Sequence, residues 1–259
     1  MKFSVTRLIR GVVDVRDRAG GGDLDGLGGP DDRRGGWSGG AIVVSAPAGR
    51  VLGSLDRGLL TRDERRRRAG PTHQDARAAA HLLVRWCAAR VTGRSPAEFA
   101  VVQRCAECGS RDHGKPFMAG FPELHISLAH RPGAVAAGAG WSPVGVDVEV
   151  PDARGGAPAA VPDVLSPAEV AQVRAAVDPA SAFLRLWVRK ECLVKLGVTT
   201  LDSLRDVDLA GTTGDRLAGG VTATRYGRLH VADWVDAAPG AVVAAAGCEL
   251  PVRGAFPRA

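Results

Sequence analysis

An internal repeat constrains the fold of this chain more than any other feature of its sequence. Leu165–Glu169 (LSPAE) echoes Leu60–Glu64 (LTRDE), and the apolar spacing that predicts a helix over 182–196 echoes the spacing over 77–90. Each half runs from a short apolar strand through a hydroxyl residue that can cap a helix to a long helix with a tryptophan. Two copies are fewer than the three or more that a stacked repeat array needs. The sequence therefore predicts two related halves.

Short apolar segments between these helices are typical of strands. We expect a helix over 72–91, a hairpin around Pro239-Gly240, and strands over 41–46, 125–128, 135–139 and 144–150. Helices and strands together predict an α+β fold. Because residues 16–40 are dominated by Gly, Asp and Arg without a regular period, we expect 1–40 to be a variable, partly flexible segment. The predicted lobes are then 41–142 and 143–259.

The charge of the chain indicates acidic partners. Its 259 residues include 34 Lys and Arg against 28 Asp and Glu, so the net charge is +6 and the pI is near 9.5. Nucleic acid, a phosphorylated small molecule or an acidic protein surface would each suit this balance. Only four of the basic residues are lysines. In such an arginine-rich chain, a lysine indicates a position where a compact, titratable ammonium matters.

The sequence predicts a cytoplasmic enzyme. Its apolar runs are much shorter than the roughly 20 residues of a membrane span. Arg and Asp interrupt the amino terminus before the core of a signal peptide can develop. Five cysteines, an odd number, argue against a disulfide framework and for reduced thiols.

The segment Gly145-Val146-Asp147-Val148-Glu149 alternates small or apolar residues with acids. On a strand, Asp147 and Glu149 share one face, and the valines lie on the other. Paired carboxylates suit a hard cation such as Mg2+, which takes one or two carboxylates together with waters and phosphates. The alternative is a strand face exposed to solvent.

The expected helix over 182–196 carries a second group of polar residues. Trp187, Glu191 and Lys195 follow one another at four-residue intervals and lie on one stripe, with Lys190 beside them. This stripe would present an aromatic ring, an acid and amines together. The alternative is an exposed Glu–Lys pair worth about 0.3–0.5 kcal/mol, which is common on helices.

Two shorter segments contain candidate ligand-binding residues. HISLAH at 125–130 leads into a turn that could place Ser127 and His130 beside a phosphate, although a lone histidine is more often structural. Gly109 to Lys115 matches the GxxxxGK part of a P-loop. Pro116 stands where that loop requires Ser or Thr, and no strand precedes the segment, which excludes a P-loop.

Two further patterns carry little functional weight. Residues 36–40 spell GxSxG, but they lie in the Gly-rich segment instead of a strand-to-helix turn, which argues against a hydrolase. Cys105 and Cys108, with His113 nearby, have metal-like spacing without a second ligand pair. A turn with free thiols is the favoured interpretation.

Taken in order, four segments resemble the surfactin-type (Sfp-type) 4'-phosphopantetheinyl transferase family. They are GKP at 114–116, HISLAH at 125–130, VGVDVEV at 144–150 and FLRLWVRKECLVKLG at 183–197. The resemblance spans residues 41–250 and is strongest in the last segment. It implies two similar α+β lobes joined as an intramolecular pseudodimer. Coenzyme A would bind between the lobes as co-substrate, with Mg2+ on its diphosphate.

The resemblance also implies roles for individual residues. Asp147, Glu149 and Glu191 match the metal-side carboxylates, and Lys195 matches the lysine near the phosphates and the leaving group. His130 matches the histidine at the 3'-phosphate of coenzyme A. The full set of implied coenzyme A-binding residues is Lys115, Pro116, Ser127, His130, Lys190 and, from the amino half, His81. Ala129 departs from the family, which has a hydroxyl residue there.

The implied reaction moves the 4'-phosphopantetheine arm of coenzyme A to a serine of an apo acyl or peptidyl carrier protein and releases adenosine 3',5'-bisphosphate. Glu191 would accept the serine proton, and Lys195 would stabilise the departing phosphate. The expected protein is a monomeric, Mg-dependent transferase of polyketide or nonribosomal peptide biosynthesis. It would need neither nucleic acid nor a membrane.

Two alternatives remain open from the sequence. The first is a basic nucleic-acid-binding module with a CxxC metal site, which the charge and Cys105/Cys108 support but which leaves the acidic motifs unexplained. The second is a degenerate, non-catalytic relative of the transferases, suggested by Ala129.

Overall fold

The computed structural model describes residues 40–66, 71–105, 108–110, 114–151, 161–211, 214–236 and 240–257. The segment expected at 1–40, except Gly40, lies outside these ranges, as do most of the GxSxG pattern and His113. Within the described ranges, each helix is too short or too polar to cross a membrane.

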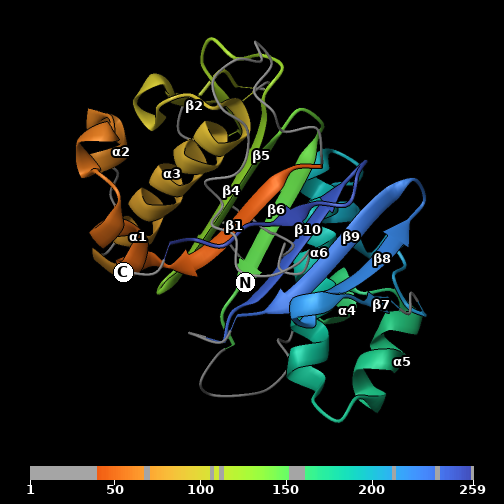
Figure 1. The fold of residues 1–259 in the computed structure, drawn as a ribbon. Helices are drawn as coiled ribbons and strands as arrows, with labels where there is room; N and C mark the ends of the chain where they lie inside the picture. The colour runs from red at the N-terminus through yellow and green to blue at the C-terminus, as the bar shows by residue number, and fades with distance from the viewer. Residues whose placement is uncertain are drawn as a thin grey trace.

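Two sheets form the middle layers of the fold (Figure 1). The first has the order β11-β1-β5-β4 and the second the order β6-β10-β9-β8-β7. Only β1 and β11 pair in parallel; the other neighbours in these two sheets are antiparallel. The first sheet contains β1 (Ile42–Pro47), β4 (His125–Arg131), β5 (Ala134–Gly140) and β11 (Val252–Arg253). The second contains β6 (Val144–Glu149), β7 (Asp215–Arg216), β8 (Thr222–Tyr226), β9 (Leu229–Val235) and β10 (Val242–Gly247).

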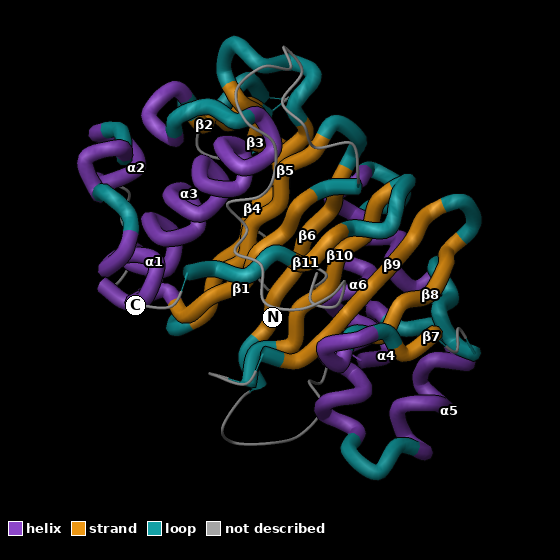
Figure 2. The backbone as a smooth tube through the Cα atoms, in the orientation of Figure 1, coloured by secondary structure: helices purple, strands orange, loops and turns teal. Residues whose placement is uncertain are grey.

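Two long helices cover these sheets on opposite sides (Figure 2). α3 (Pro71–Thr92) packs on β4 and β5, and α6 (Pro179–Leu196) packs on β6 and β10. A separate hairpin pairs β2 (Val101–Arg104) with β3 (Lys115–Met118). The shorter helices are α1 (Ala48–Ser54), α2 (Arg62–Arg66), α4 (Val161–Val164) and α5 (Pro167–Ala175). The 3-10 turns are η2 (Arg57–Leu59), η3 (Pro96–Glu98), η4 (Leu201–Asp206) and η5 (Ala218–Gly220).

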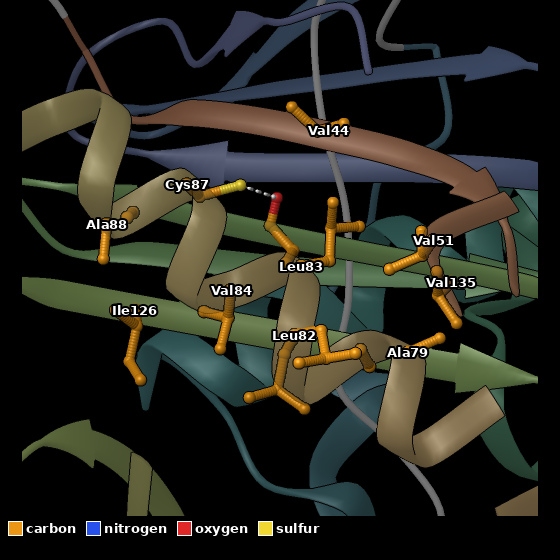
Figure 3. Packing of buried hydrophobic residues seen from close by; sticks show 14 of the residues in the cluster. Val44, Val51, Ala79, Leu82, Leu83, Val84, Cys87, Ala88, Ile126 and Val135 are labelled. Atoms are coloured by element: carbon orange, nitrogen blue, oxygen red, sulfur yellow. Dashed lines mark hydrogen bonds between the residues drawn. The ribbon is translucent and has the colours of Figure 1, made fainter. Parts of the chain in front are cut away.

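Strand alternation sorts the apolar side chains into three clusters. One lies between α3 and the first sheet, where Leu83 and Cys87 point toward β1 and β5 (Figure 3). Another lies between α6 and the second sheet. The third joins Val43 of β1 to Val146 of β6 and to Trp234 of β9, so the two sheets pack face to face. The layers therefore run helix, sheet, sheet, helix.

The structure confirms the elements expected from the apolar patterns. The predicted strands correspond to β1, β4, β5 and β6, the predicted hairpin to β9 and β10, and the predicted helices to α3 and α6. The fold is thus of the α+β class. One connection was not expected: β11 comes from the range assigned to the C-terminal lobe, yet it pairs with β1 of the first sheet.

The same helix start recurs in both halves. Thr61 and Glu64 exchange side-chain and main-chain hydrogen bonds at the start of α2. Ser166 and Glu169 do the same at the start of α5. These capping boxes satisfy main-chain N–H groups that a helix start leaves without partners.

Each of these glutamates is buried and pairs with a cation of the long helix. Glu64 lies 3.0 Å from Arg85 of α3, and Glu169 lies 2.6 Å from Lys190 of α6. Two residues after each cation, a buried thiol donates to a carbonyl of the underlying sheet: Cys87 to Ala137 O (Figure 3), and Cys192 to Ala244 O. The repeated sequence pattern therefore corresponds to repeated contacts.

Gly145 allows α6 to approach β6 closely. A Cβ atom at this position would collide with the carbonyl oxygen of Cys192 and would lie 3.0 Å from the Cγ of Leu196. Cys192 O is part of the helix backbone, so the helix itself would have to move. A glycine on β6 is thus required for the spacing between the two elements.

We expect Gly145→Ala to lower the free energy of unfolding by about 1–3 kcal/mol, the usual cost of inserting an atom into a packed core. Urea unfolding followed by circular dichroism measures it. The matched control is Gly53→Ala on α1, where the added Cβ meets no atom within 4 Å and should leave stability equal or higher. Equal stability of wild type and Gly145→Ala would contradict the close-approach argument.

Candidate functional site

Local sequence signals fix both ends of α6. Asp178 accepts a hydrogen bond from the main-chain N–H of Ser181, and Pro179 occupies the first helical position. Gly197 ends the helix with φ of 78°, a left-handed conformation that glycine adopts without a Cβ penalty. The helix therefore spans the whole motif from Trp187 to Lys195.

Alternation along β6 separates its valines from its carboxylates. Val144, Val146 and Val148 belong to the cluster between the sheets. Asp147 and Glu149 consequently lie on the opposite face, which α6 covers. Asp147 is 0% exposed and Glu149 is 7% exposed. The interpretation of this segment as a solvent-exposed strand face is therefore wrong.

α6 adds an acid and an amine against this face. Glu191 is fully buried, and Lys195 is 8% exposed. The Lys195 ammonium lies 3.1 Å from Asp147 Oδ1 and donates to the main-chain carbonyl of Val146. The alternative of an exposed Glu–Lys pair on the helix surface is wrong, because both side chains are buried.

Glu149 is held by two donors from different elements. Arg131, the last residue of β4, donates from Nε to Glu149 Oε2 at 2.5 Å and from an Nη to Oε1. The indole N–H of Trp187 donates to Oε1 at 3.3 Å. Sequence reasoning missed Arg131, because its contact with β6 joins two sheets. The only sequence signal was a basic residue directly after His130.

Arg131 interacts electrostatically with Asp147 and Glu191 as well as with Glu149. Burial alone would lower the pKa of Arg131, but the ion pair with Glu149 and the charges of Asp147 and Glu191 outweigh burial and raise it. The charge of Arg131 therefore interacts with the charges of all three predicted metal-side carboxylates.

The carboxylates have the oxygen chemistry that Mg2+ prefers. Within the described ranges, His, Cys, Asp and Glu side chains do not converge in groups of three or more that could hold an ion. A pair of carboxylates is nevertheless enough for Mg2+ when waters and phosphates complete its shell. Asp147 and Glu191 are both buried, and the charges of both act on Arg131.

Lys190 lies in a closed polar cage. Its ammonium donates to the carbonyls of Val164, Leu204 and Val207 at 2.6–2.9 Å and pairs with Glu169. Burial lowers the pKa of Lys190, and the ion pair with Glu169 opposes that shift. The hydrogen bonds of this ammonium therefore connect α6 to Glu169, Val164, Leu204 and Val207 and stabilise the second half.

The structure separates Ser127 from His130. The two residues are three positions apart on β4, whose pairing with β5 is regular, so their side chains lie on opposite faces. Ser127 is 2% exposed, and its hydroxyl has no hydrogen-bond partner among the described residues. His130 is partly buried. Contacts of Ser127 and His130 with a phosphate stay predictions.

Lys115 and Pro116 begin β3. Lys115 is exposed and Pro116 is buried. Burial and the charge of Lys115 both lower the pKa of His125, which places the lysine near the start of β4. His130 lies five residues after His125 on β4, which corresponds to about 16 Å along the strand. Their contacts with coenzyme A stay predictions.

His81 belongs to the buried network at the start of α2. Its Nδ1 lies 2.6 Å from Glu64, which also accepts from Arg85. Burial lowers the pKa of His81 against the effect of its hydrogen bond to Glu64. Burial would raise the pKa of Glu64, but the contacts with His81, Thr61 and Arg85 bring it down to about 2. Coenzyme A binding by His81 stays a prediction.

The two cysteines with metal-like spacing lie at the end of the β2 strand. Cys105 is partly buried and Cys108 is exposed. Their proposed neighbour His113 falls outside the described residues. The part of the chain that the structure describes has no metal-holding group at this place.

A comparison with known families finds a similarity over part of the second half of the chain. Residues 143–243 match the family model described as the 4'-phosphopantetheinyl transferase superfamily. The matched range begins just before β6, includes α6 and ends in β10, so it contains Asp147, Glu149, Glu191 and Lys195. No curated protein matches the chain. Residues 143–243 are therefore similar to that superfamily, which supports a transferase of this kind.

The cage around Lys190 can be tested by stability. We expect Lys190→Met to lower the free energy of unfolding by about 3–5 kcal/mol, because Glu169 is left buried without its cation. Lys115→Met, which removes an exposed lysine, should change it by less than about 0.5 kcal/mol. Chemical denaturation measures both. Unchanged stability of Lys190→Met with weakened coenzyme A binding would instead support a ligand-binding role.

Proposed function

We propose that this protein transfers the 4'-phosphopantetheine arm of coenzyme A to a serine of an apo acyl or peptidyl carrier protein. The observation that carries the proposal is the buried group of Asp147, Glu191 and Lys195 between β6 and α6, inside the range matched by the transferase superfamily. An acidic pair beside an ammonium suits the transfer of a phosphoryl-linked group.

In the proposed reaction, the serine hydroxyl oxygen attacks the phosphorus that carries pantetheine. A new P–O bond forms to the serine, and the bond to the bridging diphosphate oxygen breaks. The electron pair leaves with adenosine 3',5'-bisphosphate. Glu191 accepts the serine proton, directly or through water. Lys195 donates hydrogen bonds to the departing phosphate, where negative charge develops.

Asp147 and Glu191 would hold a divalent cation, for which Mg2+ is the expected choice. When bound, the cation neutralises charge on the diphosphate and aligns it. Removing it with EDTA should stop the reaction. Lys195 also keeps Asp147 oriented through its 3.1 Å contact.

The first half supplies the remaining parts of the proposed site. We propose that the halves form an Sfp-type pseudodimer, which the repeated capping boxes and thiol contacts support. Coenzyme A would bind between them, with His130 of β4 and Lys115 of β3 near its nucleotide. Lys190 is left out of this set because its ammonium is enclosed.

Other expectations remain part of the proposal. They are cytoplasmic location, a working monomer, and service to fatty-acid, polyketide or nonribosomal peptide carrier proteins. The basic balance of the chain would favour an acidic carrier surface. The nucleic-acid alternative gains no support from the residues that the structure describes.

We expect Glu191→Gln to reduce transfer by about 100-fold or more, because the amide neither accepts the serine proton nor binds a cation as a carboxylate does. Intact-mass analysis of an apo carrier protein incubated with enzyme, coenzyme A and Mg2+ measures the added arm. Glu249→Gln is the control, since Glu249 is exposed and lies beyond the matched range. Turnover of Glu191→Gln near that of wild type would refute the assigned role.

A further inference from the structure

Arg131 grips Glu149 with a two-pronged ion pair. Nε and one Nη donate to different oxygens of the same carboxylate, the arrangement that makes arginine–carboxylate pairs strong and directional. Trp187 adds a third donor to Oε1. Both oxygens of Glu149 are therefore occupied by donors of the protein itself.

This ion pair is largely withdrawn from solvent. The side chain of Arg131 is 21% exposed and that of Glu149 is 10% exposed. A cation that took Glu149 as a ligand would have to detach the guanidinium and leave it partly buried without its partner, which is unfavourable. Arginine also stays charged under all ordinary conditions. The pair should therefore persist when a cation arrives.

Asp147 and Glu191 are enough carboxylates for a Mg2+ site without Glu149. Asp147 and Glu191 provide two carboxylates, and Mg2+ commonly takes one or two together with waters and phosphates. Both of these carboxylates are fully buried. The charge of Arg131 still acts on Asp147 and Glu191.

We propose that Arg131 is a built-in counter-ion that keeps Glu149 out of the cation's ligand set, so that Asp147 and Glu191 alone bind the ion. This inference rests on the proposed function, because that function supplies the cation. Glu149 then acts as a positioning residue, which anchors Arg131 at the edge of the site. Arg131 in turn presents a fixed positive charge beside the bound cation.

The test measures Mn2+ affinity as a stand-in for Mg2+, by the loss of the free Mn2+ electron paramagnetic resonance signal. In the wild-type background, we expect Glu149→Gln to change Mn2+ affinity by less than about threefold and Asp147→Asn to weaken it by about tenfold or more. In an Arg131→Ala background, Glu149 is released toward the ion. There, Glu149→Gln should weaken Mn2+ binding by about tenfold.

Arg185→Ala is the matched control, because Arg185 also forms a partly buried ion pair on α6, but with Asp233 of β9. It should leave Mn2+ affinity unchanged. Circular dichroism checks that each variant is folded, and Arg131→Gln replaces Arg131→Ala if the latter is not.

A crystal structure with Mn2+ gives the second readout. We expect the ion at Asp147 and Glu191, with Arg131 still paired to Glu149. Equal effects of Glu149→Gln in both backgrounds, or direct coordination by Glu149, would overturn this inference alone. Failure of wild type to bind Mn2+ would refute the cation in the proposed function, and this inference with it.

Discussion

The contact between α6 and β6 is the constraint on which the site depends. Gly145 lacks the Cβ that would strike the helix backbone at Cys192, and the helix consequently lies close enough for Lys195 to reach Val146 O and Asp147. This contact joins Lys195 of the α6 motif and Asp147 of the β6 motif in one buried polar group. In a low-dielectric setting, such groups interact more strongly than they would at the surface.

Both halves pair a buried glutamate with a cation of the long helix, but the described acids of the proposed site lie in one of them. Ala137 pairs with Val44 in the first sheet, and its counterpart Ala244 pairs with Asp147 in the second. Likewise, Trp86 follows the buried cation of α3, where Glu191 follows the cation of α6. The first half thus keeps an apolar core at positions where the second half carries charge.

Sequence reasoning reached the central part of the site because both of its segments are local. The two-residue period of β6 and the four-residue spacing along α6 place Asp147, Glu191 and Lys195 without knowledge of distant contacts. It failed where partners are far apart in the chain. Arg131 is 18 residues from Glu149, and the cage of Lys190 is built from carbonyls of α4, η4 and the residue after η4.

By itself, the sequence determined the α+β class, the repeated helix starts and the two acidic motifs, because each depends on periodicity or on capping within a few residues. Only the tertiary structure decided which charges are enclosed and what they touch. Lys190 became part of the scaffold, and Ser127 and His130 fell on opposite faces of β4. Arg131 reached across to Glu149. Burial and long-range pairing arise when sheets and helices pack, and no local pattern encodes them.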